Sequence, residues 1–278
     1  MFLKNIFIKA TTIVTLLIII TWLLFPYYWM FITALKSDWE LYVYPPAFYP
    51  QEPTLKHFIS FLVEKNGIYY FLNSIIVCSS VVILTLIIVI PAAYALTRYN
   101  VPQRFYRNIL SFYLSQRFLP PIAIVIPLFA VIRGIGLYDS IYSLILSYTF
   151  FNIPLAIWLL SSYLKEVPKD IEEAALLDGL TRFRTFFIIL LPLIFPQLVS
   201  TLILLFIFSW NEFLFALIFT ATIKSQTLPI ATWNLVTQFK IDWHAMAVAG
   251  ILTSIVPAIT FLSLRRYIIR GLTFGMVK

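Results

Sequence analysis

The stretch that decides the fold is Glu172–Pro192, with the sequence EEAALLDGLTRFRTFFIILLP. It is a long charged island between hydrophobic runs in the second half of the chain. Its acidic residues lie close in sequence to four basic ones, Lys165, Lys169, Arg182 and Arg184. Because unpaired charges are very costly in an apolar environment, such an island must work in contact with water.

The composition indicates that this charged segment belongs to a membrane protein. The chain of 278 residues is 61% hydrophobic and 12% charged, whereas soluble domains are about half apolar and a quarter charged. The apolar runs predict an all-α polytopic membrane protein. No small-residue cleavage pattern follows the first run, so we expect a retained span. A single cysteine, Cys78, excludes an internal disulfide and a cysteine-based metal cluster.

Six transmembrane helices are expected in a single transmembrane domain over residues 1–278. The fifth apolar run continues to Thr222, too long for one span and too short for two. We therefore expect the fifth span to end near Trp210, followed by an apolar segment at the outer membrane face. The expected spans are Thr12–Leu35, Phe71–Leu96, Ile109–Ile132, Ile141–Leu164, Phe186–Trp210 and Met246–Leu264.

The distribution of Lys and Arg orients these spans. With both termini in the cytoplasm, the inner segments hold roughly twice as many basic residues as the outer ones. The charged island then becomes a cytoplasmic loop, at about 165–185. Long outer loops are expected at about 36–70 and 211–245, and a cytoplasmic tail at 265–278. The net charge of +8 therefore reflects topology, and no basic soluble domain suggests nucleic-acid binding.

Within the cytoplasmic loop the sequence predicts a short helix at about 171–177. Asp170 and Glu173 have the spacing of a capping box, and Gly179 can adopt the left-handed conformation that ends a helix. Helical periodicity gives the helix two faces. We expect a small docking face of Ile171, Ala174, Ala175 and Asp178, and an anchoring face of Leu176, Leu177 and Leu180. The alternative is an amphipathic helix that rests on the membrane.

The spacing of the loop resembles the EAA loop of ABC importer permeases. Glu173-Ala174-Ala175, then Gly179, and finally Ile189, Leu191 and Pro192 match E-A-A-x3-G-x9-I-x-L-P at every fixed position. Further motifs resemble the maltose-type carbohydrate permeases, in particular their shorter six-span member. These motifs are Asn73-Ser74, Trp210-Asn211-Glu212-Phe213, Thr227-Leu228-Pro229 and the tail Gly271–Lys278.

The resemblance implies a type I importer fold and a set of partners. These are a second permease subunit, as a heterodimer, two ATPase subunits and an extracytoplasmic sugar-binding protein. The chain has no G-x-x-x-x-G-K-[ST] phosphate loop, so ATP and Mg belong to the partner ATPase and the chain is not an enzyme. The residues expected to couple to the ATPase are Asp170, Glu172, Glu173, Ala174, Ala175, Asp178, Gly179, Leu180 and Pro192. In the tail, Gly271, Thr273, Gly275 and Lys278 are expected to contact the ATPases, the alternative being a frayed basic end.

Polar residues within or beside the spans are candidates for the substrate pathway, because they are costly there. These candidates are Arg117, Asn152, Asn211 and Glu212. For Asn152 a structural role beside Pro154 is the stronger interpretation. His57 and His244 are expected to be lone surface histidines with no metal spacing, so no metal site is predicted.

Three alternatives stay open or are weighed against these motifs. A permease for a non-sugar solute, such as glycerol phosphate or an amino acid, would carry the same coupling loop. A non-transport structural subunit of a membrane complex leaves the complete loop pattern unexplained. An intramembrane enzyme would need a catalytic set within the spans, and the sequence contains no H-E-x-x-H motif or paired intramembrane aspartates.

Overall fold

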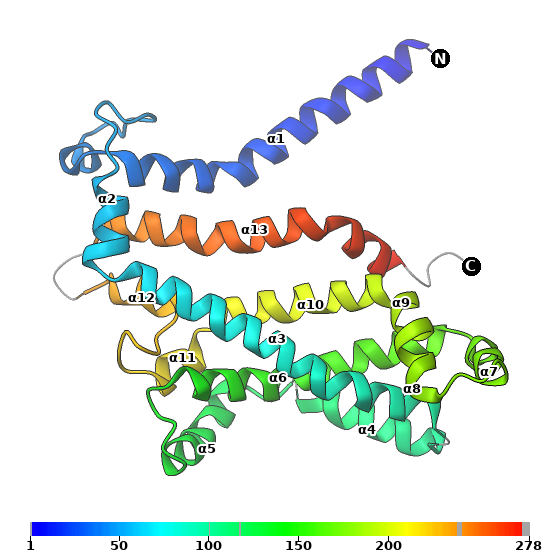
Figure 1. The fold of residues 1–278 in the computed structure, drawn as a ribbon. Coiled ribbons are helices and arrows are strands. Elements are labelled where there is room, and N and C mark those ends of the chain that lie inside the picture. The colour runs from blue at the N-terminus through cyan, green and yellow to red at the C-terminus, as the bar shows by residue number, and fades with distance from the viewer. Residues whose placement is uncertain (1, 100, 117, 238–240, 274–278) are drawn as a thin grey trace. The chain divides into compact units, whose positions relative to one another are not determined.

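The computed structural model describes residues 2–99, 101–116, 118–237 and 241–273, and within them the regular elements are helices (Figure 1). Val236 and Ile241 form an isolated antiparallel bridge. The chain divides into two units, one of residues 1–68 with 231–255 and one of residues 69–230 with 256–278. The predicted all-α class is confirmed.

Four helices are long and apolar enough to cross a membrane, and each contains one interior proline. The sequence predicted the span in each of them to within four residues, except at two ends. The first helix begins at Phe2, ten residues before the expected start at Thr12, and the last helix, α13, ends later than expected. Its expected span ended at Leu264, but the helix continues to Thr273. The four helices are α1 (Phe2–Leu35), α3 (Gly67–Arg98), α6 (Ile141–Glu166) and α13 (Trp243–Thr273).

The third and fifth expected spans are each broken. α4 (Gln103–Gln116) and α5 (Pro121–Gly134) meet at 91°, and the helical segment Arg182–Leu193 meets α10 (Phe195–Trp210) at 76°. Each bent pair contains a proline at or beside the break, which removes a helical hydrogen bond. The described part of the chain therefore has six spans if each bent pair is one span.

In the unit of residues 1–68 and 231–255, the segment after α1 is held by buried polar contacts. It contains a 3-10 helix, η1 (Asp38–Tyr42), the short helix α2 (Lys56–Ile59) and a π-helical turn, η2 (Ser60–Glu64). Glu40, which is 2% exposed, accepts hydrogen bonds from the backbone and hydroxyl of Ser37 and from the backbone of Gln51. The segment that was expected to be the first outer loop is therefore an ordered structure.

In the unit of residues 69–230 and 256–278, α6 is the central helix, and most of its apolar stretch is buried inside the protein. It packs against α4, α10 and α11 (Leu214–Phe219). Phe215, Ala216 and Phe219 of α11 are almost completely buried. The apolar segment after Trp210, which was expected at the outer membrane face, is therefore part of the core of this unit. Cys78 of α3 is also buried, at 1% exposed.

Candidate functional site

The predicted loop helix is α7 (Lys169–Leu177), followed by α8 (Arg182–Thr185). The expected capping box is wrong, because α7 starts before Asp170 and its N-cap position is Pro168, with no side-chain cap. The fixed φ of proline suits a helix start, and this moves Asp170 into the exposed first turn. Glu173 is also exposed.

The end of α7 has the predicted glycine geometry. Gly179 has φ +89°, the backbone of Gly179 donates to Leu176 O at 3.1 Å, and that of Leu180 donates to Ala175 O at 3.1 Å. These two bonds define a Schellman motif, in which glycine carries the left-handed residue. A Cβ atom added to Gly179 would meet no other atom within 4 Å, so the glycine is required by backbone conformation and not by space.

The two faces of α7 differ from the prediction. Ala175, expected on the docking face, is 4% exposed, and Leu177, expected to anchor the helix, is 89% exposed. The buried side of the helix is formed by Glu172 and Ala175, with Leu176 half-buried. The exposed side presents Ile171, Ala174, Leu177 and Asp178. The outward face of α7 is therefore more apolar than the sequence suggested.

A buried ion pair anchors α7 to the end of α3. Arg98 Nε lies 3.0 Å from Glu172 Oε2, and Tyr94 donates its hydroxyl proton to Glu172 Oε1 at 2.6 Å. Arg98 Nη2 also donates to the carbonyl oxygen of Val167 at 2.9 Å, just before α7 begins. Sequence reasoning missed Tyr94 and Arg98 as site residues. The available signal was a basic residue at the end of an expected span, which was used only to predict the orientation of the spans.

The remaining coupling candidates lie apart from this anchor. Pro192 is in α9 (Leu191–Leu193), after the π-helical turn η3 (Phe186–Leu190) and beside the bend of the fifth span. Gly271 and Thr273 are in the last turns of α13. Gly275 and Lys278 lie outside the described residues, as does the pathway candidate Arg117.

The described pathway candidates are engaged in local hydrogen bonds. Asn152, 4% exposed, donates from Nδ2 to Ser209 Oγ at 3.0 Å, which links α6 to α10. Asn211 donates to the carbonyl oxygen of Ile207 at 2.9 Å. The carboxylate of Glu212 accepts from the backbone of Phe215 and Ala216 at 3.1 and 3.3 Å, at the start of α11. These contacts give each residue a structural task.

The Asn73-Ser74 motif holds the segment that contains Thr227-Leu228-Pro229. Asn73 Nδ2 donates to the carbonyl oxygens of Ile223 and Gln226, each at 2.9 Å, and Ser74 Oγ accepts from the backbone of Leu228 at 2.8 Å. Two motifs far apart in sequence are therefore one structural feature, a clamp between α3 and the segment before α12 (Leu228–Asn234).

Asp139 holds the other side of the same segment. Its carboxylate accepts from the backbone of Ala221 and Thr222 at 2.8 and 2.9 Å and from the hydroxyls of Thr222 and Ser225. Burial raises the pKa of Asp139, but these hydrogen bonds, led by that from Ser225, outweigh it and hold the pKa at about 2. Asp139 is therefore ionised across the physiological range.

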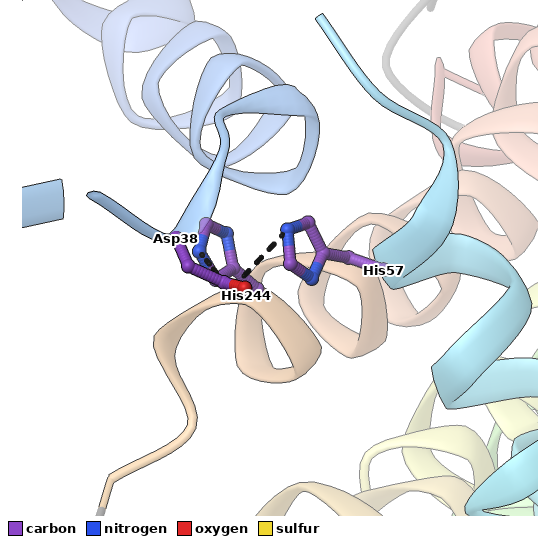
Figure 2. Close-up of side chains that lie close together, drawn as sticks. All are labelled: Asp38, His57 and His244. Carbon is purple, nitrogen blue, oxygen red and sulfur yellow. Dashed lines mark ion pairs between the residues drawn. The ribbon is translucent and has the colours of Figure 1, made fainter. Parts of the chain in front are cut away.

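The interpretation of His57 and His244 as lone surface histidines was wrong. They are 8% and 5% exposed, and their rings are stacked, with centroids 3.6 Å apart and planes at 4°. Asp38 lies beside both rings (Figure 2). Burial lowers the pKa of His57, and the adjacent His244 lowers it further. The three residues are distant in sequence, so no local spacing could indicate the cluster.

Comparisons with known proteins agree with the loop pattern. The family described as binding-protein-dependent transport system inner membrane component matches residues 89–274. The sulfoquinovosyl glycerol transport system permease protein of Agrobacterium fabrum is 34% identical over 92% of this chain and 89% of its own. The diacetylchitobiose uptake system permease protein of Streptomyces coelicolor is 32% identical over 99% of both chains. The trehalose/maltose transport system permease protein of Thermococcus litoralis is 35% identical over 92% and 91%.

A solved structure shares the fold. A chain of a bacterial ABC transporter involved in the import of the acidic polysaccharide alginate superposes with a TM-score of 0.78 and 21% identity, over 95% of this chain and 96% of that one. A chain of the MetNI methionine ABC transporter superposes with a TM-score of 0.58 over 73% of this chain. The helical arrangement is therefore that of an ABC importer permease.

Proposed function

Because the chain belongs to the family of binding-protein-dependent transport system inner membrane components, we propose that it carries a carbohydrate or glycoside and that α7 is its docking site for a separate ATPase. The chain is a multi-pass permease of the cytoplasmic membrane in an ABC importer, and it is not itself the ATPase.

The geometry of α7 supports the docking role. Exposed apolar surface marks sites of protein–protein interaction, and Leu177 on the outward face of α7 is 89% exposed. The opposite face is fixed by the buried pair of Glu172 and Arg98. A helix that is anchored on one side and apolar on the other can be pushed as a rigid body. Glu172 would therefore position α7, while Ile171, Ala174 and Leu177 would enter a cleft on the ATPase.

The surrounding loop would complete the coupling site. Asp170, Glu173 and Asp178 are exposed and would make polar contacts at the rim of that cleft. Gly179 and Leu180 would fix the exit of the chain from α7 through the Schellman motif. The end of α13, with Gly271 and Thr273, would approach the ATPases as well, and so would Gly275 and Lys278.

The proposed orientation follows from charge. The termini and α7 would lie in the cytoplasm, on the side that is richer in Lys and Arg. The partners would be a second permease subunit, two ATPase subunits that bind ATP and Mg, and an extracytoplasmic binding protein. The proposed binding protein has a parallel in the solved bacterial alginate ABC transporter, whose structure is a complex with a pentasaccharide-bound periplasmic protein.

The substrate class is suggested by the relatives. Those with an assigned cargo are named for sulfoquinovosyl glycerol, diacetylchitobiose and trehalose or maltose, all of which contain sugar rings. Of the pathway candidates, Asn211 is exposed and we propose that it lines the route with Arg117. The contacts of Asn152 and Glu212 favour a packing role for both. Identification of the co-purifying binding protein, and of the solutes that it binds, tests the proposal. A protein that binds only amino acids or glycerol phosphate would overturn it.

The docking role is tested by Leu177→Asp in the intact complex. We expect the variant chain to reach the membrane but to co-purify with much less ATPase, because a charge enters the apolar contact. The matched control is Leu55→Asp, at another exposed leucine outside the loop, which should leave ATPase co-purification unchanged. Equal ATPase recovery from both variants would exclude α7 as the docking site.

A further inference from the structure

The cluster of Asp38, His57 and His244 lies outside the coupling site and has no task in the proposed transport mechanism. Its three residues come from three different elements, η1, α2 and the first turn of α13 (Figure 2). One potential ligand atom from each residue lies within 4.8 Å of the others. Both imidazoles are more than nine-tenths buried.

The hydrogen bond of His244 sets its tautomer. Nδ1 lies 2.8 Å from the carbonyl oxygen of Thr33, which can only accept, so Nδ1 carries the proton. In the neutral ring, Nε2 then has a bare lone pair. Nε2 is buried, has no hydrogen-bond partner and lies 3.6 Å from Asp38 Oδ1. The Nε2 lone pair and the Asp38 oxygen are both hydrogen-bond acceptors, so their close approach is unfavourable. A cation bound between them would stabilise the pair.

This arrangement around His244 is that of a metal-binding histidine. Such histidines typically donate their other ring N–H to a carbonyl or carboxylate, which fixes the tautomer and the ring orientation. The carbonyl oxygen of Thr33 occupies that outer position. Histidine and carboxylate ligands together suit first-row transition ions such as Zn²⁺ more than Mg²⁺ or Ca²⁺.

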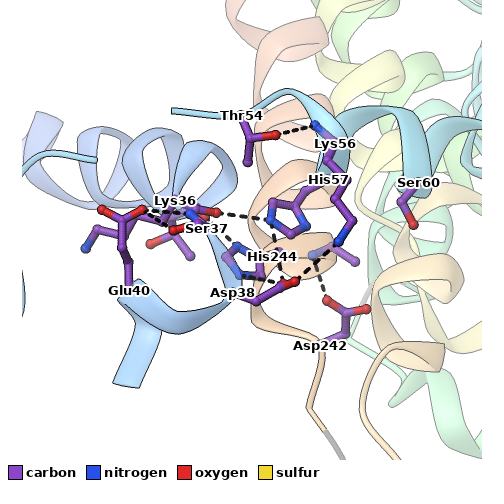
Figure 3. Close-up of polar contacts among 12 residues, drawn as sticks. Lys36, Ser37, Asp38, Glu40, Thr54, Lys56, His57, Ser60, Asp242 and His244 are labelled. Atoms are coloured by element: carbon purple, nitrogen blue, oxygen red, sulfur yellow. Dashed lines mark hydrogen bonds and ion pairs between the residues drawn. The ribbon is translucent and has the colours of Figure 1, made fainter. Parts of the chain in front are cut away.

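Asp38 divides its two oxygens between different partners. Oδ2 accepts a hydrogen bond from Lys56 Nζ at 3.3 Å, while Oδ1 faces the imidazoles (Figure 3). Oδ1 lies 3.8 Å from His57 Nε2 and 3.6 Å from His244 Nε2. Ligand atoms at tetrahedral Zn²⁺, with bonds of about 2.1 Å, are about 3.4 Å apart. These two separations exceed that value by only a few tenths of an ångström, and all three ligand atoms lie within 4.8 Å of one another.

We propose that Asp38, His57 and His244 form a binding site for a divalent transition metal ion of the zinc class. His244 offers Nε2, Asp38 offers Oδ1 and His57 offers Nε2, which lies 3.0 Å from the carbonyl oxygen of Lys36. Because the Lys36 carbonyl oxygen can only accept, Nε2 of His57 carries the proton before binding. Binding moves this proton to Nδ1, and the Lys36 carbonyl oxygen, released from its hydrogen bond, can then serve as a further metal ligand. Parallel rings cannot both aim an in-plane lone pair at one ion, so binding also turns one ring out of the stack.

An ion can reach the cluster from solvent. The site lies at a cleft of about 470 Å³ that is also lined by Lys56, Glu64 and Asp242. The side chain of Asp38 is 70% exposed, which opens the carboxylate side to the cleft. Lys56 competes with the ion for this carboxylate. A bound ion would join the segment after α1 to the start of α13, two parts of the same unit that are far apart in sequence.

Zinc titration of the full-length protein tests the proposal. The protein is purified in detergent through a tag without histidine, stripped with a chelator and titrated with ZnCl₂ by calorimetry. We expect saturable binding with one ion per chain, inhibition by Co²⁺ and no inhibition by Mg²⁺ or Ca²⁺. Asp38→Asn, His57→Gln and His244→Gln each remove a ligand and should each weaken binding by more than about 10–100-fold, the usual cost of removing an outer-shell partner.

Matched variants separate ligation from general damage. Glu64→Gln alters a carboxylate in the same cleft and should leave zinc affinity unchanged, while Lys56→Met should strengthen binding by releasing Asp38. Because Asp38 is exposed, Asp38→Asn reports on ligation even if a buried histidine variant fails to fold. No saturable zinc binding below about 1 mM, or equal affinity in wild type and Asp38→Asn, would overturn the proposal.

Discussion

Arg98 Nε lies 3.0 Å from Glu172 Oε2, and less than a tenth of either side chain is exposed. This pair joins the last residue of α3 to the first turn of α7. A displacement of α7 would therefore act directly on a long apolar helix. In an importer driven by a separate ATPase, such a contact would pass movement from α7, the proposed docking helix, to a membrane span.

The first prediction concerns this ion pair. Glu172→Leu leaves the Arg98 charge buried without its partner, which typically costs about 3–5 kcal/mol. The double variant Arg98→Met with Glu172→Leu should recover much of that loss, because no buried charge remains. Thermal unfolding of the purified chain measures both effects. A double variant as unstable as the sum of the two single ones would show that the residues do not interact.

The second prediction concerns Gly179. Gly179→Ala forces a side chain into a left-handed conformation and should destabilise the loop by about 1–2 kcal/mol, although there is room for the methyl group. Gly179→Asn should be milder, since asparagine tolerates this conformation better. Limited proteolysis between α7 and α8 measures the loosening of the loop. If both variants are cut as slowly as wild type, the Schellman motif is not needed to order the loop.

The third prediction concerns the hydrogen bond between Asn152 and Ser209. Interhelical hydrogen bonds in membrane proteins contribute about 0.6 kcal/mol on average and at most about 2 kcal/mol. A double-mutant cycle with Asn152→Ala and Ser209→Ala should give a coupling energy in this range, measured by unfolding. Uptake by proteoliposomes that contain the Asn152→Ala complex should remain close to wild type. A large loss of uptake with unchanged stability would instead place Asn152 in the pathway.

The fourth prediction concerns Asp139 and pH. Its folded pKa of about 2 lies below the usual 3.8, so the folded state binds fewer protons than the unfolded state between these values. The stability that Asp139 contributes is therefore present above about pH 4 and is lost as the pH falls through about 2. Asp139→Asn should remove this part of the pH dependence. The difference in melting temperature between wild type and variant, measured at pH 7, 4 and 3, should shrink on acidification.

The sequence predicted the fold class and the helix of the charged loop because both depend on local patterns. Apolar runs of membrane length gave the four unbroken spans, and a charged loop with a terminal glycine gave α7 and its left-handed Gly179. The size of the bends in the third and fifth spans could not be predicted. Proline is common in transmembrane helices and often causes only a small kink, so the sequence did not indicate angles of 91° and 76°.

The faces of α7 and the histidine cluster required tertiary information. A leucine in a short helix is expected to be buried, but the partner that fixes this helix is the charge of Arg98, so Glu172 faces inward and Leu177 faces outward. In the same way, His57 and His244 are separated by most of the chain and meet only because α2 lies against the start of α13.

The burial of Cys78 has a practical consequence. As the only cysteine of the chain, at 1% exposed, it is shielded from water-soluble thiol reagents. A cysteine introduced at an exposed position such as Leu177 would then be the single reactive thiol, without prior removal of the native one. Fluorophores or spin labels could follow the loop through a transport cycle in an otherwise unaltered protein.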